Sequence, residues 1–195
     1  MTEIIKDNGG LLHNFMIFEY SDVEPSKSSD GIVTMKGIIQ KAQSPNANNR
    51  IYPRPILERE DAKYQELIKE RRSLGELDHP DSPIVQLENV SHLLTETNWD
   101  GDDLVGTVEV LDTPKGQILE KLIGRDIKLG ISSRGLGSTS RTNEGYDMVE
   151  DDFSLVCYDM VSNPSTSGAY MNLQESREYK TLVSQDRMVL LDEIL

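Results

Sequence analysis

The sequence contains a single cysteine, Cys157, and lacks any run of 18 or more apolar residues. One cysteine cannot form an intrachain disulfide or supply a thiolate metal cluster, so the sequence predicts a protein of a reducing cytoplasm. The missing apolar run argues against a membrane-spanning helix. The first seven residues lack the basic start and long apolar stretch of a secretory signal, which argues against export.

Basic residues are also scarce, because 20 lysines and arginines face 34 aspartates and glutamates and leave a net charge of −14. A surface this acidic repels phosphate backbones and anionic lipids, so nucleic acid is not an expected partner. Neither a Gly-x-Gly-x-x-Gly nor a P-loop pattern occurs, and no nucleotide cofactor is predicted. Hydrophobic residues make up 36% of the chain, which suffices for one core but leaves little for a second.

Hydrophobic periodicity predicts an α+β protein that is mainly β. Helices are expected at 55–72 and 113–124, the second starting at a capping threonine followed by proline. Strands are expected at 31–40, 85–99, 104–111, 127–137, 146–149 and 153–161, with a hairpin turn at 100–103. Turn-type residues predict loops at 24–31 and 44–50 and a break at 73–83, and a short helix is expected after Glu178. Alternating βαβ order is absent, which disfavours a Rossmann-type fold and favours a sheet or β-barrel core flanked by helices.

His79 has the most suggestive setting of the three histidines. It lies in a proline-bounded turn near Glu76, Asp78 and Asp81, and these carboxylates favour its protonated form. Such a histidine is suited to proton transfer near neutral pH. Asp78, His79 and Asp81 could instead hold a metal ion, but adjacent residues rarely point at one ion. We therefore expect neither a metal nor a cofactor.

A second unusual stretch runs from Gly130 to Gly137 and contains Ser132, Ser133 and Arg134 among glycines. A serine nucleophile needs a base within reach and donors for the developing oxyanion, and glycines let a substrate backbone approach closely. The alternatives are a glycine-rich turn with a solvated arginine, or a loop that binds phosphate.

Four motifs occur in one order: Asn49-Arg50-Ile51-Tyr52-Pro53, Gly75-Glu76-Leu77-Asp78-His79-Pro80, Gly130 to Gly137, and Val161-Ser162-Asn163-Pro164-Ser165. Over roughly residues 31–171 they resemble the prohead core proteases of T-even-type tailed bacteriophages, a family similar to the herpesvirus assemblin proteases. The resemblance implies an assemblin-like β-barrel core flanked by helices. It also implies a serine endopeptidase that cleaves scaffold and capsid proteins, itself included, inside the immature capsid in the host cytoplasm.

The resemblance assigns His79 as the general base and Ser132 as the nucleophile, with Ser133 as the alternative one position away. It implies a third member some two dozen residues after the serine, and Asp159 follows it by 159 − 132 = 27 residues. A charge inside an apolar strand is costly unless paired, and orienting His79 would pair Asp159. His92 is the rival, although it precedes the serine. Arg134 is expected to support the oxyanion, directly or through water.

The expected organisation is an N-terminal segment at 1–30, a protease domain at 31–171 and a removable tail at 172–195. Resembling proteases cut after a glutamate that follows Leu or Ile by two residues, which predicts self-cleavage after Glu175 and Glu193. Exposed termini offer the extended backbone that such cleavage needs. The competing function is a catalytically inactive scaffold component of the prohead. The sequence leaves a homo-oligomer open.

Overall fold

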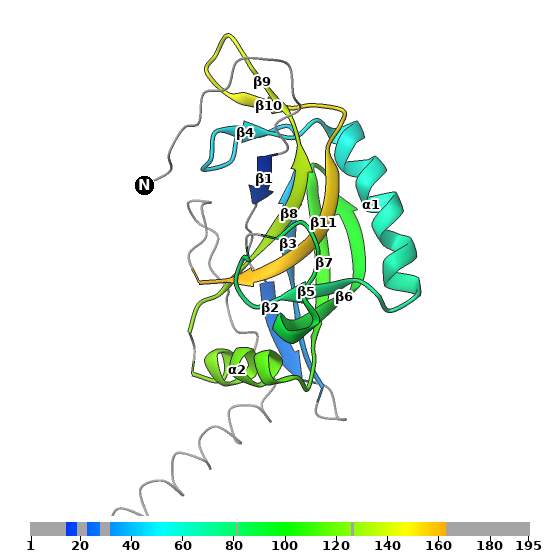
Figure 1. Ribbon diagram of the computed structural model, residues 1–195, viewed down its shortest axis with the longest axis vertical. Helices are drawn as coiled ribbons and strands as arrows, with labels where there is room; N and C mark the ends of the chain where they lie inside the picture. Colours follow the sequence, from blue (N-terminus) through cyan, green and yellow to red (C-terminus); the bar gives the residue numbers. More distant parts are fainter. Residues whose placement is uncertain (1–14, 19–22, 28–31, 81, 126, 163–195) are drawn as a thin grey trace, which may run out of the picture.

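The computed structural model describes residues 15–18, 23–27, 32–80, 82–125 and 127–162. Within them, strands dominate and two α-helices lie beside the strands (Figure 1). The strands are β1 (Phe15–Phe18), β2 (Val23–Lys27), β3 (Val33–Lys41), β4 (Arg50–Ile51), β5 (Leu74–Glu76), β6 (Val90–Asp100), β7 (Asp103–Val110), β8 (Gly130–Gly137), β9 (Thr139–Arg141), β10 (Asp147–Val149) and β11 (Ser154–Val161). The helices are α1 (Arg54–Lys69) and α2 (Pro114–Ile123), and a 3-10 turn, η1, covers Leu87–Asn89. The prediction of a mainly β protein with flanking helices is confirmed.

The strands form three sheets among the described residues. The largest has the order β2-β3-β7-β6-β5, the second β1-β8-β11, and a small one β4-β10-β9. The first two meet where Leu77, just after β5, forms a parallel bridge with Met160 of β11. There the amide of Asp78 donates to the Met160 carbonyl at 2.7 Å. Residues near 77 are thereby held against a strand that lies some 80 positions later in the chain.

The main core lies between the sheets and the two helices. It contains buried side chains from α1, α2, five strands and the residue before β8, namely Met35, Ile39, Tyr64, Leu94, Leu104, Val108, Leu119, Ile123, Leu129, Ile131, Tyr158 and Met160. Tyr64 of α1 packs edge-on against Tyr158 of β11, with ring centroids 5.4 Å apart. Burial of this apolar surface provides the main driving force for the fold. In Figure 1, α1 lies along one side of the strands and α2 across one end.

Local signals explain the elements that the sequence predicts well. The Thr113 hydroxyl accepts a hydrogen bond from the Gly116 amide at 3.0 Å, and Pro114 occupies the first helical position of α2. Gly101 adopts φ +59° in the turn between β6 and β7, a conformation that side chains disfavour. Neither described helix is long and apolar enough to cross a membrane.

Short strands account for most differences from the sequence prediction. The expected loop at 24–31 contributes β2, an edge strand in which Pro25 is tolerated because edge positions do not all need a donor. The expected break at 73–83 contains β5, and the expected strand at 85–99 begins with η1. Tertiary pairing selects these segments, and a strand of three residues is too short to show periodicity. The helix expected after Glu178 lies outside the described residues.

Candidate active site

His79 is held by the connection that leaves β5. Asp78 adopts φ +72°, a left-handed conformation that aspartate tolerates better than most residues, and its Oδ1 accepts from the His79 amide at 3.0 Å. This turn directs the imidazole toward β11, where Nδ1 lies 2.9 Å from Asp159 Oδ2. The His79 side chain is 14% exposed and Asp159 is fully buried. The two residues predicted to work together are thus in direct contact.

The antiparallel register of β8 and β11 distinguishes the two candidate serines. Ser132 lies opposite Asp159 and Ser133 lies opposite Tyr158. Paired residues point to the same face of a sheet and neighbours point to opposite faces. Ser133 therefore shares the face of Tyr158, which belongs to the apolar core, whereas Ser132 shares the face of Asp159. Among these two positions, only Ser132 faces the carboxylate that contacts His79.

Ser132 is fully buried, and no described residue hydrogen-bonds its Oγ. A hydrogen bond from Ser132 to His79 is therefore not formed in this structure. Catalytic hydrogen bonds are often long in the absence of substrate and tighten only in the complex. A substrate carbonyl can reach this Oγ only after neighbouring groups move.

Asp159 takes part in four hydrogen bonds and in an ion pair with Arg134 Nε. Oδ2 lies 2.9 Å from both His79 Nδ1 and Arg134 Nε, and Oδ1 accepts from the Glu76 amide at 3.0 Å. The Cys157 thiol and Arg134 Nη2 complete the set at 3.2 and 3.3 Å from Oδ1. Burial alone would raise the pKa of Asp159, but the His79 hydrogen bond and the Arg134 charge outweigh burial and lower that pKa below its usual value. Asp159 is an ionised acceptor at neutral pH.

Arg134 is fully buried, and its contacts differ from those of an arginine that binds the oxyanion directly. Nε and Nη2 lie against Asp159, Nη1 donates to the Ser82 carbonyl at 2.8 Å, and Nη2 lies 3.4 Å from Glu76 Oε1. Each guanidinium nitrogen therefore has a partner within the protein. This arrangement favours action through Asp159 rather than on substrate.

His92, the rival third member, lies on β6 with both ring nitrogens engaged elsewhere. Nδ1 is 2.8 Å from Ser91 Oγ and Nε2 is 3.0 Å from the Tyr158 carbonyl oxygen. Burial lowers the pKa of His92 to about 4, so its imidazole is neutral at pH 7. The structure thus brings Asp159, and not His92, into contact with His79.

The segment from Gly130 to Gly137 is a central strand rather than a turn or a phosphate loop. β8 pairs with β1 on one side and β11 on the other, so its backbone groups are used within the sheet. Its glycines serve internal packing, because a Cβ on Gly135 would lie 2.5 Å from the Phe153 ring. Both the turn and the phosphate-loop interpretations of this stretch are wrong.

The metal alternative gains no support from the described residues, in which no group of three His, Cys, Asp or Glu side chains is arranged to hold an ion. Asp81 lies outside those residues. The sequence predicts for Glu76 only a charge effect on His79 and predicts no role in the site for Cys157, yet both residues are buried beside Asp159. No local signal could have found the contact of Glu76 with Asp159, because pairing with distant strands selects β5.

Comparison with known proteins identifies the family to which the chain belongs. A family model described as prohead core protein serine protease matches residues 6–181. The prohead core protein protease of Enterobacteria phage T4 is 36% identical over 151 residues, which are 75% of this chain and 71% of that protein. The solved structure of the bacteriophage T4 capsid assembly protease matches with a TM-score of 0.70 and 28% identity, covering 77% of this chain and 99% of that one. With a family match over nearly its whole length and a relative of this identity, the chain belongs to the prohead core protein serine protease family.

Proposed function

We propose that the chain is a serine endopeptidase of the phage prohead in which Ser132 is the nucleophile, His79 the general base and Asp159 the residue that orients His79. The observation that carries this assignment is the 2.9 Å contact between His79 Nδ1 and Asp159 Oδ2, with Ser132 directly opposite Asp159 in the sheet. Family membership supports protease activity in prohead maturation.

The reaction follows from the charge state of this group. When the Nδ1–H of neutral His79 donates a hydrogen bond to ionised Asp159, Nε2 carries the lone pair that accepts the Ser132 hydroxyl proton. Ser132 Oγ then attacks the scissile carbonyl, and the imidazolium returns the proton to the leaving amine. Water hydrolyses the acyl-enzyme by the same route and regenerates Ser132. The proposed steps use side chains of the protein and water, and the proposal includes no cofactor or metal.

The competing function, an inactive scaffold component, is not favoured, because the relatives are proteases and the His79–Asp159 contact is intact. Labelling with a serine-reactive phosphonate followed by peptide mass spectrometry tests the proposal. Wild type should be labelled at Ser132, whereas Ser132→Ala and His79→Ala should not. Wild-type protein that stays unlabelled, while cleaving no scaffold protein on co-expression, would remove the assignment.

We also propose that the sheets form an assemblin-like barrel core. The support for this proposal is the single bridge from Leu77 to Met160, which brings the β5 edge of one large sheet to the β11 edge of the other. We keep residues 31–171 as the protease domain, to whose sheets the N-terminal segment adds β1 and β2. Residues 172–195 form the proposed removable tail.

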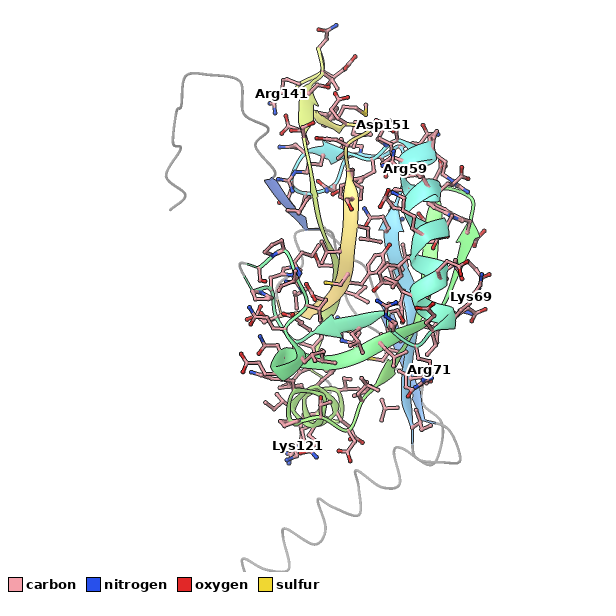
Figure 2. The ribbon with its side chains drawn as sticks, turned by 45° about the vertical axis from the view of Figure 1, so that its right-hand side comes forward. Arg59, Lys69, Arg71, Lys121, Arg141 and Asp151 are labelled. Atoms are coloured by element: carbon pink, nitrogen blue, oxygen red, sulfur yellow. The ribbon has the colours of Figure 1, made fainter. Side chains whose placement is uncertain are left out.

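The proposed substrates are phage scaffold, core and capsid proteins, cleaved inside the prohead in the host cytoplasm. Nucleic acid is not a proposed partner, since the net charge is −14. Among the cationic residues labelled in Figure 2, Arg141 lies near one end of the molecule and Lys121 near the other. A homo-oligomer is compatible with this function and is left open.

Self-cleavage after Glu175 and Glu193 is part of the proposal, and both glutamates lie outside the described residues. Within the described residues the same short pattern also ends at five other glutamates. Glu58 and Glu120 lie within α1 and α2, Glu76 and Glu96 lie in β5 and β6, and Glu70 is the C-cap residue of α1. Paired and helical backbone resists proteolysis. Intact-mass measurement of wild type and Ser132→Ala after capsid assembly should show truncation in wild type only, and equal truncation in both would refute self-cleavage.

A further inference from the structure

A buried ion-pair chain runs behind the proposed catalytic group. Glu76, Arg134 and Asp159 are each fully buried, and Arg134 lies between the two carboxylates. Arg134 Nη2 is 3.4 Å from Glu76 Oε1, and Arg134 Nε is 2.9 Å from Asp159 Oδ2. Buried charges are costly to leave unpaired, so removing the guanidinium would leave two carboxylates in each other's vicinity without a cation.

The same pair also fixes the segment that follows His79. Arg134 Nη1 donates to the carbonyl of Ser82, and the amide of Gln86 donates to Glu76 Oε1. Glu76 comes three residues before His79 and Arg134 two residues after Ser132. The segment that carries His79 is therefore attached at two points. Ser82 is bound to Arg134 of β8, and Gln86 is bound to Glu76 of β5.

We propose that Glu76 and Arg134 are positioning residues, which hold Asp159 in its orientation and hold the His79 segment over the strand that carries Ser132. The inference rests on the proposed function, and it deepens that function by adding two residues that touch neither substrate nor the reacting atoms. Arg134 compensates one of the two carboxylates, and the remaining negative charge favours the imidazolium that forms when His79 accepts a proton. The lowered pKa of Asp159 agrees with this arrangement.

A positioning role and a purely structural role predict different kinetics. Loss of a merely structural ion pair lowers the folded fraction, but each folded molecule keeps its turnover. Loss of a positioning group displaces the base, and a displacement of about 1 Å can reduce rate by a factor on the order of 10². Because Arg134 and Glu76 are shielded from solvent, their loss should lower kcat and leave KM roughly unchanged.

Arg134→Ala in the full-length chain tests the inference, with guanidinium ion added at non-denaturing concentration. We expect kcat per folded molecule to fall by about 100-fold and to recover in part with guanidinium, which can occupy the space left by the side chain. Arg59→Ala is the matched control. Arg59 also pairs with a buried carboxylate, Glu60 at 2.8 Å, but it reaches from α1 to Asp151 rather than to Asp159 (Figure 2). The control should lose stability, keep its kcat and show no recovery with guanidinium.

A readout that needs no turnover separates this inference from the proposed function. The proton on His79 Nδ1, bonded to a carboxylate, should give a low-field proton resonance in wild type that disappears in Arg134→Ala and in Asp159→Asn. If wild type itself cleaves nothing, the proposed function fails while this resonance still decides the positioning role. Unchanged kcat, or a resonance that persists in Arg134→Ala, overturns the inference. If Arg134→Ala does not fold, Glu76→Gln takes its place, because it keeps the shape of the side chain and removes one charge. Glu76→Gln should show smaller losses in kcat and in the resonance. Wild-type values of both would overturn the inference.

Discussion

Replacing Asp159 by asparagine changes one atom and reverses one hydrogen-bonding role. In wild type both carboxylate oxygens of Asp159 face donor groups. Oδ2 lies against His79 and Arg134, and Oδ1 accepts a hydrogen bond from the Glu76 amide among others. An asparagine amide offers one acceptor and one donor group, so its NH₂ must face donors on whichever side it lies. If the NH₂ faces His79, Nδ1 becomes the acceptor and the ring proton moves to Nε2. In that tautomer His79 cannot accept the Ser132 proton.

The expected magnitude follows from this tautomer argument. A triad held in the wrong tautomer loses turnover on the order of 10⁴. At about 1.4 kcal/mol for each factor of ten, that loss raises the activation free energy by about 5 kcal/mol. Stability also falls, because breaking a buried ion pair costs about 3–5 kcal/mol when one charge is left alone. Glu76 remains beside Arg134 and offsets part of that cost.

The assay must separate the two losses. Folded fraction is measured by circular dichroism at the assay temperature, and turnover of a scaffold-derived peptide is divided by it. Asp151→Asn is the control, since that side chain is 91% exposed and, among the described residues, forms its ion pair with Arg59 at the surface. Its turnover should match wild type and its unfolding free energy should change by less than about 1 kcal/mol. Turnover of Asp159→Asn within tenfold of wild type would show that Asp159 does not orient His79 and would favour His92 instead.

Ser132→Ala and His79→Ala should each abolish peptide cleavage while keeping the circular dichroism spectrum, and the double variant should be no worse, because triad members act as a unit. Ser133→Ala should keep its turnover; inactivity there, with activity in Ser132→Ala, would exchange the two serines. His92 is buried neutral with a pKa of about 4, against 6.5 when unfolded, so the unfolding free energy should fall by about 3 kcal/mol as pH drops from 6.5 to 4. His92→Gln should remove that part of the pH dependence in urea titrations, and an unaltered slope would contradict it. Gly116→Ala should destabilise the fold by about 1–3 kcal/mol in the same assay despite alanine's helix propensity, since its Cβ would lie 1.8 Å from a backbone oxygen; equal or greater stability would contradict the packing argument.

Elements with strong local signals were predictable from sequence. The apolar spacing of α1, the threonine cap and proline of α2, and the Gly101 turn between two long strands each reflect interactions within a few residues. β2 and β5 were not predictable, because partners far along the chain select them. β5 can approach the Tyr158 carbonyl because Gly75 has no Cβ.

The site divides in the same way. The resemblance supplied His79 and Ser132, and the cost of a charge in an apolar strand pointed to Asp159. The partner of Arg134 could not be inferred, since the predicted strand at 127–137 does not show which distant residues face it and the surrounding glycines also allow an open turn. The glycines instead accommodate Phe153, and the arginine is buried in a central strand. A single sequence records which residues are costly to bury, but it does not record which distant residue compensates the cost.

The contact between His79 and Asp159 joins positions 80 residues apart, and Asp159 lies on the last described strand. Contacts of such separation form late, because a long loop must close before they stabilise the chain. A polypeptide made from its N-terminus presents the proposed base and the strand of the proposed nucleophile before the proposed acceptor exists. With these roles, catalytic competence arrives with completion of the sheet and not before it. For an enzyme proposed to cut its own chain, the order of folding delays hydrolysis until its core backbone is already paired and resistant to cleavage.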